Sequence, residues 1–171
     1  MGAGKSSVGR RLASLLGVPS TTPTRRSSPP PDWIPEIFAA AGERGFRGGE
    51  RCVVARLLAG QTAVIATGGG GLRDPDTRAT IRPRATSVWL RAEVDVLWER
   101  VRERRGRPPL EVDDPRAVLA DLHRRRAPIY AEADIVVDSH RDSRALDVAH
   151  ATLKALSSSF PCGGPGRALG T

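Results

Sequence analysis

The first seven residues carry the side chains best suited to bind a phosphate group. Residues 2–7 read Gly-Ala-Gly-Lys-Ser-Ser, which matches the second half of the phosphate-binding loop pattern G-x-x-x-x-G-K-[ST]. Glycines allow backbone N–H groups to surround phosphate oxygens, Lys5 adds a positive charge, and the Ser6 hydroxyl can coordinate Mg²⁺. The pattern therefore predicts a site for the phosphates of a nucleotide, with the metal on Ser6. The residues predicted to form it are Gly2, Ala3, Gly4, Lys5, Ser6 and Ser7.

This loop is shorter than the full pattern. The first glycine of the pattern would stand before residue 1, and a buried strand is expected to precede it. In a parallel sheet that strand would be central, so its absence would leave the neighbouring strands with unpaired backbone groups. We expect a chain that lacks its first strand and folds poorly as it stands.

The composition is that of one α/β domain. The 171 residues are 39% hydrophobic and 4% aromatic, which is enough for a sizeable core. The net charge of +8 comes almost wholly from arginine, because Lys5 and Lys154 are the only lysines. Arginine-rich codon usage is the main account of this charge, and an anionic small substrate explains it as well as nucleic acid does. Because no aromatic residues are interleaved with the arginines and no reading motif is present, we do not expect nucleic-acid binding.

No feature of the sequence indicates secretion or a membrane. Cys52 and Cys162 have no metal-binding or C-x-x-C spacing, and no apolar run is long enough to span a bilayer. No signal peptide precedes the loop. We expect a cytoplasmic monomer that binds neither nucleic acid nor membrane.

Helical and strand patterns alternate along the chain. This order predicts a parallel sheet flanked by helices and joined by right-handed crossovers. Residues 20–33 have no periodicity and are predicted to be irregular, residues 106–114 to form a mobile lid, and residues 157–171 to form a loose tail. The predicted helices are 4–16, one beginning at 34, 45–58, 74–81, 94–105, 114–126 and 143–156, and the predicted strands are 62–66, 87–90 and 133–138. Ser143 is the expected N-cap of the last helix, and Val8, Leu12, Leu15 and Leu16 lie at helical spacing in the first.

Six short motifs occur in a fixed order, namely MGAGKS, IPEIF, GFR, ATGGG, RPPL and RRRAPIY. Taken together, they resemble the shikimate kinase family over residues 1–156, except for residues 20–33. The resemblance implies a P-loop fold of the nucleoside-monophosphate-kinase type. It also implies transfer of the γ-phosphoryl group of ATP to the 3-hydroxyl of shikimate, with Mg²⁺ as cofactor.

The resemblance assigns roles to several residues. It implies that Arg47 and Arg126 bind the substrate carboxylate, and that the backbone around Gly68, Gly69 and Gly70 meets its hydroxyls. Paired guanidinium groups suit this role because each can form two parallel hydrogen bonds to a carboxylate. Arg126 also follows Arg124 and Arg125, so a solvated run of charge is the alternative.

Two further arginines are assigned on the ATP side of the site. The resemblance implies that Arg107 reaches the transferring phosphate from the lid, and that Arg100 lies beside adenine. A helix-surface cation is the alternative for Arg100. Lys5 and Arg107 are the expected catalytic residues.

The chain departs from the family where an Asp-x-Asp is expected. Those positions hold Thr22 and Thr24, which carry no negative charge. Read one nucleotide late, GC-rich codons for Phe-Asp-Asp-Thr-Asp become Ser-Thr-Thr-Pro-Thr, the sequence of residues 20–24. We infer a double frameshift across residues 20–33. Two alternatives remain at this point: a kinase of another small acid, such as a gluconate kinase, or a catalytically silent homologue.

Overall fold

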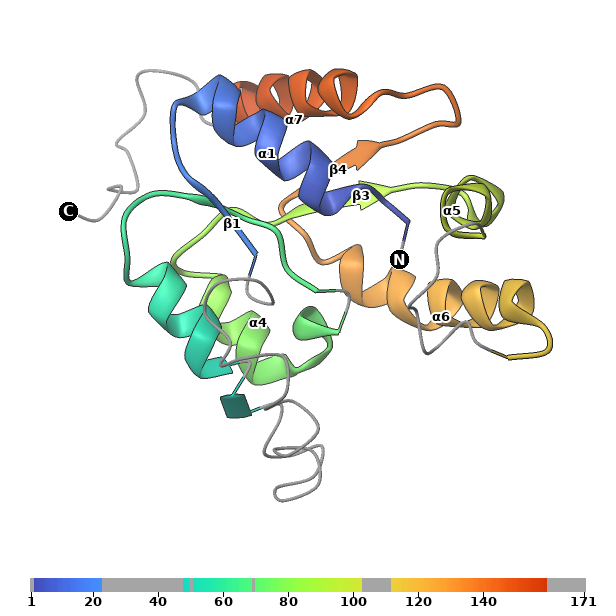
Figure 1. Ribbon diagram of the computed structural model, residues 1–171. Coiled ribbons are helices and arrows are strands. Elements are labelled where there is room, and N and C mark those ends of the chain that lie inside the picture. The colour runs from blue at the N-terminus through green and yellow to red at the C-terminus, as the bar shows by residue number, and fades with distance from the viewer. Residues whose placement is uncertain (1, 23–47, 50, 69, 103–111, 160–171) are drawn as a thin grey trace.

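Strands of parallel direction lie between two layers of helices (Figure 1). The computed structural model describes residues 2–22, 48–49, 51–68, 70–102 and 112–159. The elements in chain order are α1 (Lys5–Leu16), β1 (Ser20–Thr21), β2 (Val64–Ile65), the 3-10 turn η1 (Gly71–Arg73), α4 (Pro75–Ile81), β3 (Val88–Arg91), α5 (Val94–Val101), α6 (Pro115–Tyr130), β4 (Ile135–Asp138) and α7 (Ala145–Ser159). Residues 48–49 and 51–58 are also helical. The expected α/β class is confirmed.

The strands form two separate parallel pairs in the described part of the chain, rather than the single sheet expected. β1 pairs with β2, with Ser20 opposite Val64, and β3 pairs with β4, with Val88 opposite Ile135. The prediction that residues 20–33 are irregular is wrong for residues 20 and 21, which form β1. Their backbone pairs with β2, and the Val64 N–H donates to the Pro19 carbonyl at 2.9 Å. Strand pairing therefore overrides a composition that predicts no structure.

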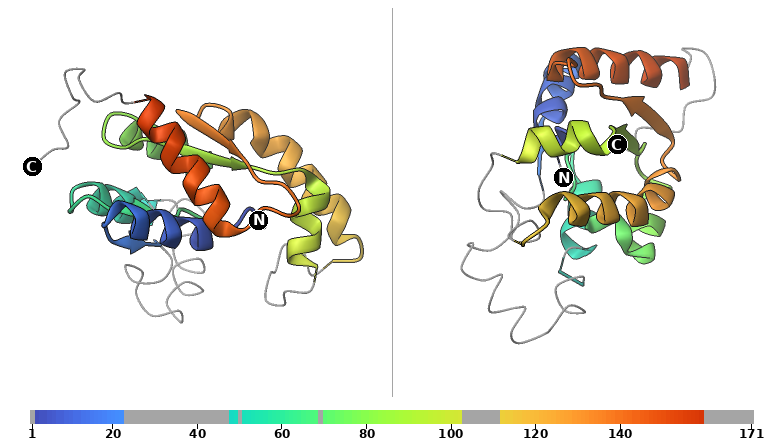
Figure 2. Two further views of the ribbon diagram at one scale, coloured as in Figure 1. Left: turned by 90° about the horizontal axis from the view of Figure 1, so that it is seen from above. Right: turned by 90° about the vertical axis from the view of Figure 1, so that its right-hand side faces the viewer.

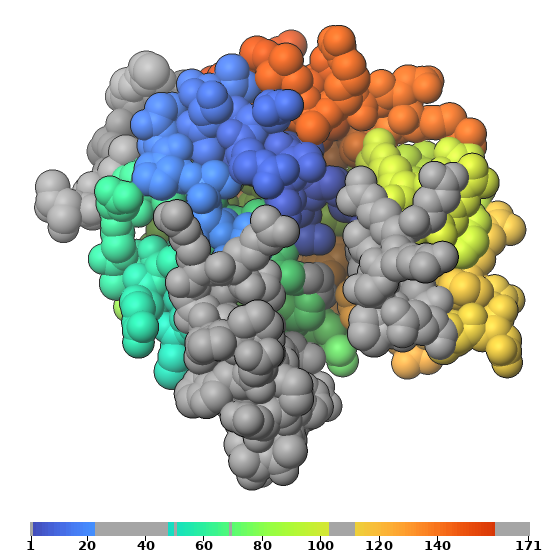
Figure 3. Space-filling view, viewed as in Figure 1, coloured from blue at the N-terminus to red at the C-terminus, as the bar shows by residue number. Residues whose placement is uncertain are grey.

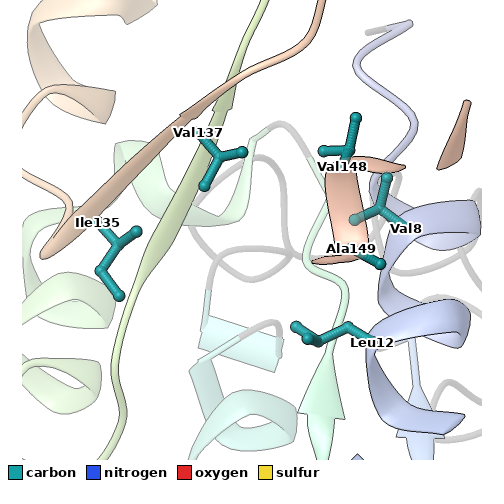
Figure 4. Packing of buried hydrophobic residues seen from close by; sticks show 6 residues of the cluster. All are labelled: Val8, Leu12, Ile135, Val137, Val148 and Ala149. Atoms are coloured by element: carbon teal, nitrogen blue, oxygen red, sulfur yellow. The ribbon is translucent and has the colours of Figure 1, made fainter. Parts of the chain in front are cut away.

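Helices α1 and α7 pack side by side over the strands, on the opposite side from α4 and α6 (Figures 1 and 2). Figure 4 shows the buried residues of this core, which are Val8, Leu12, Ile135, Val137, Val148 and Ala149. Val64 of β2 and Val88 of β3 pack against the same cluster. Both strand pairs therefore contribute to one layer beneath α1 and α7.

A second, smaller core joins α5 to α6. It consists of Ala92, Leu97, Val101 and Leu119, and Ala3 of the N-terminal loop packs against it. The loop is thus held against α5 by apolar contact as well as by its connection to α1.

Helix α1 confirms the first predicted helix, with a difference in its buried face. Gly17 ends the helix in the left-handed conformation with φ at +66°, as expected for a C-cap glycine. Val8 and Leu12 are buried, whereas Leu15 and Leu16 are exposed. The core beneath α1 and α7 therefore includes Val8 and Leu12 but not the last turn of α1.

Two helices end later than their sequence patterns predict. α6 continues past Arg126 to Tyr130 and contains Pro128, a residue that cannot donate a backbone hydrogen bond within a helix. The Tyr130 ring lies 6.1 Å from the Trp89 ring, centroid to centroid, so this last turn lies against β3. α7 extends through residues 157–159, where serine hydroxyls donate to carbonyls four residues earlier. The prediction of a loose tail from residue 157 is therefore wrong for residues 157–159.

The start of α7 and the burial of β4 also differ from expectation. Ser143 is not the N-cap, because α7 begins at Ala145 and the Ser143 hydroxyl accepts from the His140 N–H at 2.9 Å. β4 is buried on one face only, since Val136 is exposed between buried Ile135 and Val137. The helix expected from residue 34, most of the lid at 106–114 and the tail from residue 160 lie outside the described residues.

Candidate active site

The N-terminal loop adopts a conformation that requires glycine. Gly2 and Gly4 have φ of +75° and +78°, in the left-handed region that other residues rarely adopt. A Cβ on Gly2 would lie 2.8 Å from the Leu97 carbonyl oxygen. Gly4 is the N-cap of α1 and contributes no side chain, and the first turn of α1 holds no acidic residue. The loop and helix end therefore present backbone N–H groups and the positive end of the helix dipole, which suits a phosphate.

A cavity of about 660 Å³ opens beside this loop. Lys5 at the start of α1, Gly68 after β2 and Arg126 on α6 all line it. Three residues far apart in the sequence are thus brought to one space. Figure 3 shows α1, in blue, below α7, in orange, on the face where the N-terminal loop lies. This arrangement can hold one anion at Lys5 and a second at Arg126.

Arg126 differs in its surroundings from the two arginines before it. Arg124 and Arg125 are exposed and bind the Asp121 carboxylate at 2.6 and 2.8 Å. Arg126 is half-buried and lines the cavity. A solvated run of charge accounts for Arg124 and Arg125 but does not account for Arg126.

The glycines after β2 leave room at the cavity. A Cβ on Gly68 would meet no heavy atom within 4 Å. Gly70 has an ordinary φ of −99° at the start of η1, and Gly68 is not among the glycines with positive φ. The backbone conformation therefore does not require glycine at either position. Among the described residues, no atom fills the space at Gly68, which suits the approach of a bound molecule.

Arg100 lies away from the cavity, at the turn that follows β4. Its Nη1 donates to the Ser139 hydroxyl at 3.0 Å and its Nη2 donates to the His140 carbonyl at 2.6 Å. The neighbouring Glu99 pairs with Arg141 at 2.6 Å. These contacts join α5 to residues 139–141 of the turn after β4.

Three predicted site residues lie outside the described part of the chain, namely Arg47, Gly69 and Arg107. Ser6 is exposed in the first turn of α1, where its hydroxyl is available to a metal ion. Thr22 follows β1, at the same edge of the sheet as Thr67 and Gly68 after β2. Among the described residues, no three His, Cys, Asp or Glu side chains gather as a metal site. The residues present thus fit a Mg²⁺ ion held by Ser6 and by phosphate oxygens. Position 22 holds threonine and so contributes no carboxylate to the ion.

Sequence reasoning missed Arg78 on α4. Its Nη1 donates to the carbonyls of Leu72 and Arg73 at 2.9 and 3.0 Å, and its Nε pairs with Glu132 at 3.3 Å. Arg78 also lines the cavity and holds η1 in place behind the glycines. The sequence signal for its position was the Asp74-Pro75 pair, which predicts the start of the helix that carries Arg78. In the structure the Asp74 carboxylate accepts a hydrogen bond from the Thr77 N–H at 3.0 Å.

Comparison with known proteins decides the family. The sequence model described as "Shikimate kinase" matches residues 1–157.

The chain belongs to the shikimate kinase family.

Curated shikimate kinases agree with this assignment. The shikimate kinase of Rhodopseudomonas palustris is 50% identical over 140 residues, which cover 81% of this chain and 69% of that protein. The one from Rhizobium leguminosarum is 48% identical over 159 residues, covering 91% of this chain and 80% of that protein. Members of this family are ATP-dependent phosphotransferases that use Mg²⁺.

Solved shikimate kinases share the fold. The enzyme of Acinetobacter baumannii, solved in complex with shikimate, has a TM-score of 0.81 and 34% identity and covers 94% of this chain and 90% of its own. The Aquifex aeolicus enzyme has a TM-score of 0.71 and 28% identity and covers 94% of each chain. The α/β fold of a P-loop kinase is thereby confirmed. In the part of the chain that the structure describes, no helix is both long and apolar enough to cross a bilayer.

Proposed function

We propose that this chain transfers the γ-phosphoryl group of ATP to the 3-hydroxyl of shikimate. The observation that carries the proposal is the shared cavity, which places the Lys5 ammonium and the Arg126 guanidinium in one space beside the glycine loop. A phosphate and a carboxylate are the two anions that this reaction brings together. Family membership supports the same assignment.

On the ATP side, Gly2 to Ser7 bind the phosphates through their backbone N–H groups, and Lys5 neutralises the charge on the transferring group. The Ser6 hydroxyl would hold Mg²⁺, which would supply positive charge to the phosphate oxygens. Arg107 stabilises the transferring group from a lid at residues 106–114, and Arg100 lies beside adenine.

On the acid side, Arg126 and Arg47 bind the carboxylate of shikimate. The backbone at Gly68, Gly69 and Gly70 meets its hydroxyls. In the transfer, the 3-hydroxyl oxygen forms a bond to the γ-phosphorus, the bond from that phosphorus to the leaving ADP oxygen breaks, and the hydroxyl proton is released. Thr22 carries no charge and accepts no proton, so we expect a rate lower by about 10²–10⁴-fold than that of a site with a carboxylate there.

The surface charge supports a small substrate rather than nucleic acid. Several exposed arginines are paired with carboxylates of the same chain, for example Arg116 with Asp95 at 2.7 Å and Arg144 with Asp147 at 3.0 Å. Cations paired in this way attract a phosphate backbone less strongly. We therefore propose shikimate rather than nucleic acid as the partner, and we also propose that the chain is a cytoplasmic monomer.

The test is ADP release from the full chain with ATP and Mg²⁺, measured with shikimate, with gluconate and with neither. We expect release with shikimate alone. Arg126→Ala should raise the KM for shikimate at least tenfold, because it removes a carboxylate-binding group, whereas Arg125→Ala should leave it unchanged. Release with gluconate instead would favour the other small-acid kinase.

A catalytically silent homologue is the second candidate, and uncharged Thr22 favours it. In that case the chain would bind an ATP analogue and shikimate but release no ADP with any acid. Binding measured by calorimetry separates this outcome from loss of the whole site.

A further inference from the structure

Arg78 of α4 lies between the two parts of the cavity that are proposed above to bind the acid. It lines the cavity together with Gly68 and Arg126. The turn η1, which follows the glycines, packs against both α4 and α6. Arg78 takes no part in the transfer proposed above, although it is an arginine inside the site. Its printed contacts are to the backbone of η1 and to Glu132, which points to a role in the geometry of the site.

On one side, Arg78 holds the turn that follows the glycines. Its Nη1 donates to the carbonyl oxygens of Leu72 and Arg73 at 2.9 and 3.0 Å. The last carbonyls of a helical turn have no partner within the turn, so a cation beside them satisfies them. The Gly71 N–H donates to the Gly68 carbonyl at 3.3 Å, which ties η1 to the glycine that lines the cavity. Arg78 therefore restrains the glycine backbone through η1.

On the other side, Arg78 pairs with the segment that follows α6. Its Nε lies 3.3 Å from Oε2 of Glu132. The Glu132 N–H donates to the Ile129 carbonyl at 3.3 Å, which ties Glu132 to the last turn of α6. Arg126 lies about one turn earlier in the same helix and lines the cavity. The pair therefore links the glycine turn to the helix that carries Arg126.

The planar guanidinium allows one side chain to make both sets of contacts. It presents N–H donors in a fixed fork, so Nη1 can meet the carbonyls while Nε faces the carboxylate. A lysine ammonium is a single point charge and cannot hold both partners at a fixed angle. The side chains of Arg78 and Glu132 are 28% and 59% exposed, so their pairing contributes little to stability. Its main consequence is the relative placement of the two elements.

We propose that Arg78 is a positioning residue for the acid, which sets the distance between the glycine turn and Arg126 so that one bound molecule meets both. The carboxylate at Arg126 and the hydroxyls at the glycine backbone belong to one small ring, so the two groups that bind them must lie at a fixed separation. This inference rests on the proposed function, because the bound acid is the one assigned there.

The test compares Arg78→Lys and Glu132→Gln with the parent chain, by ADP release at varied shikimate and at varied ATP. We expect the KM for shikimate to rise about tenfold in Arg78→Lys and about threefold in Glu132→Gln. The KM for ATP and kcat should stay within about twofold, because the phosphate loop has no contact with this junction. Glu132→Gln removes only an exposed charge, so it keeps the test valid if Arg78→Lys does not fold.

Arg116→Lys is the matched control. Arg116 also pairs with a carboxylate of another element, Asp95 of α5, at 2.7 Å, but it does not line the cavity. We expect the KM for shikimate to be unchanged in this variant. An equal rise in the control and in Arg78→Lys would overturn the proposal, as would an unchanged KM for shikimate in Arg78→Lys or equal rises in its two KM values.

A double-mutant cycle separates positioning from direct contact with the acid. Once Arg126 is replaced, the distance between Arg126 and the glycine turn no longer matters to the acid. Arg78→Lys should therefore change the KM for shikimate less than about twofold in the Arg126→Ala background. A full tenfold rise in that background would show that Arg78 acts on the acid independently of Arg126, and would overturn the positioning role.

Two further measurements keep failure of this inference distinct from failure of the proposed function. Calorimetric binding of shikimate to the parent chain tests the function itself, and no binding would refute the function. Amide hydrogen exchange without any ligand tests the junction. We expect Arg78→Lys to speed exchange at Gly71 and Arg73 at least about fivefold, and Arg116→Lys to leave it unchanged. Unchanged exchange at both amides in Arg78→Lys would overturn the inference whether or not shikimate binds.

Discussion

The Arg100 guanidinium donates to the Ser139 hydroxyl at 3.0 Å and thereby joins α5 to the turn after β4. Ser139 is only 4% exposed, so its hydroxyl lies in a place with little access to water. The second bond of Arg100, to the His140 carbonyl, fixes the orientation of the guanidinium plane. If adenine lies beside Arg100, as proposed, Ser139 positions the side chain that the base meets.

Loss of this hydroxyl should therefore affect ATP and spare shikimate. We expect Ser139→Ala to raise the KM for ATP about fivefold, the equivalent of about 1 kcal/mol for one hydrogen bond, with kcat little changed. The control is Ser158→Ala, which removes an exposed hydroxyl of α7. Steady-state ADP release at varied ATP is the measurement, and an unchanged KM for ATP would refute the positioning role.

The two lysines of the chain make a matched pair for testing the phosphate site. Lys5 lines the cavity, whereas Lys154 is exposed on α7. Lys5→Met keeps the length of the side chain but removes its charge, and we expect kcat/KM to fall by about 10²–10³-fold. Lys154→Met should retain full activity. A fall of similar size in both variants would point to net charge rather than to the site.

The glycines of the N-terminal loop differ in what surrounds them. We expect Gly2→Ala to lower the free energy of unfolding by about 1–3 kcal/mol, because the new Cβ would approach the Leu97 carbonyl oxygen in a left-handed backbone. Gly17→Ala has the same backbone penalty but no neighbour within 4 Å, and should lower it by only about 1 kcal/mol. Urea unfolding of the two variants measures both free energies of unfolding. An equal loss of free energy in the two variants would contradict the prediction.

Restoring the expected carboxylates should raise activity. We expect Thr22→Asp combined with Thr24→Asp to increase kcat at least about tenfold in Mg²⁺, because carboxylates supply a metal contact and a proton acceptor. Ser20→Asp places a charge at an exposed position of β1, two residues before Thr22, and serves as the control. If both variants behave like the parent chain, the lost carboxylates are not what limits the rate.

Acid should weaken the junction between β3 and β4. Hydrogen bonds from Arg91, at 2.5 and 2.8 Å, hold the pKa of Asp138 below its ordinary value of 3.8. Burial acts to raise the pKa of Asp134, but bonds from the Ser87 N–H and hydroxyl outweigh it, so this pKa is also lowered. A lowered native pKa means that each contribution is complete above pH 3.8 and is lost as the pH falls through the native value.

The measurement is the Tm between pH 6 and pH 2. We expect a fall that begins near pH 4, where the carboxylates start to protonate. Ser87→Ala removes one of the bonds to Asp134 and should make the fall shallower, whereas Ser157→Ala should leave its slope unchanged. A Tm independent of pH in this range would show that the two carboxylates do not contribute.

Elements with strong local signals could be predicted from the sequence. α1 begins after glycines and ends at Gly17, and α4 begins at the Asp74-Pro75 pair, because caps and proline act through the neighbouring backbone. The phosphate loop was predictable for the same reason, since left-handed Gly2 and Gly4 need no distant contact to be identified. The residues expected to bind the substrate carboxylate were predicted from the resemblance to the family's motifs.

What the sequence determined by itself is the class of the fold, the family and the loop that binds phosphate, because these depend on residue type and short spacing. The tertiary structure decided which of three adjacent arginines lines the cavity, that Ser20 and Thr21 form a strand, and that the strands of the described residues lie in two pairs. Each of those outcomes depends on contacts between residues far apart in the chain. Local propensity contains no information about them, because the free energy that selects among them arises only when the distant segments pack together.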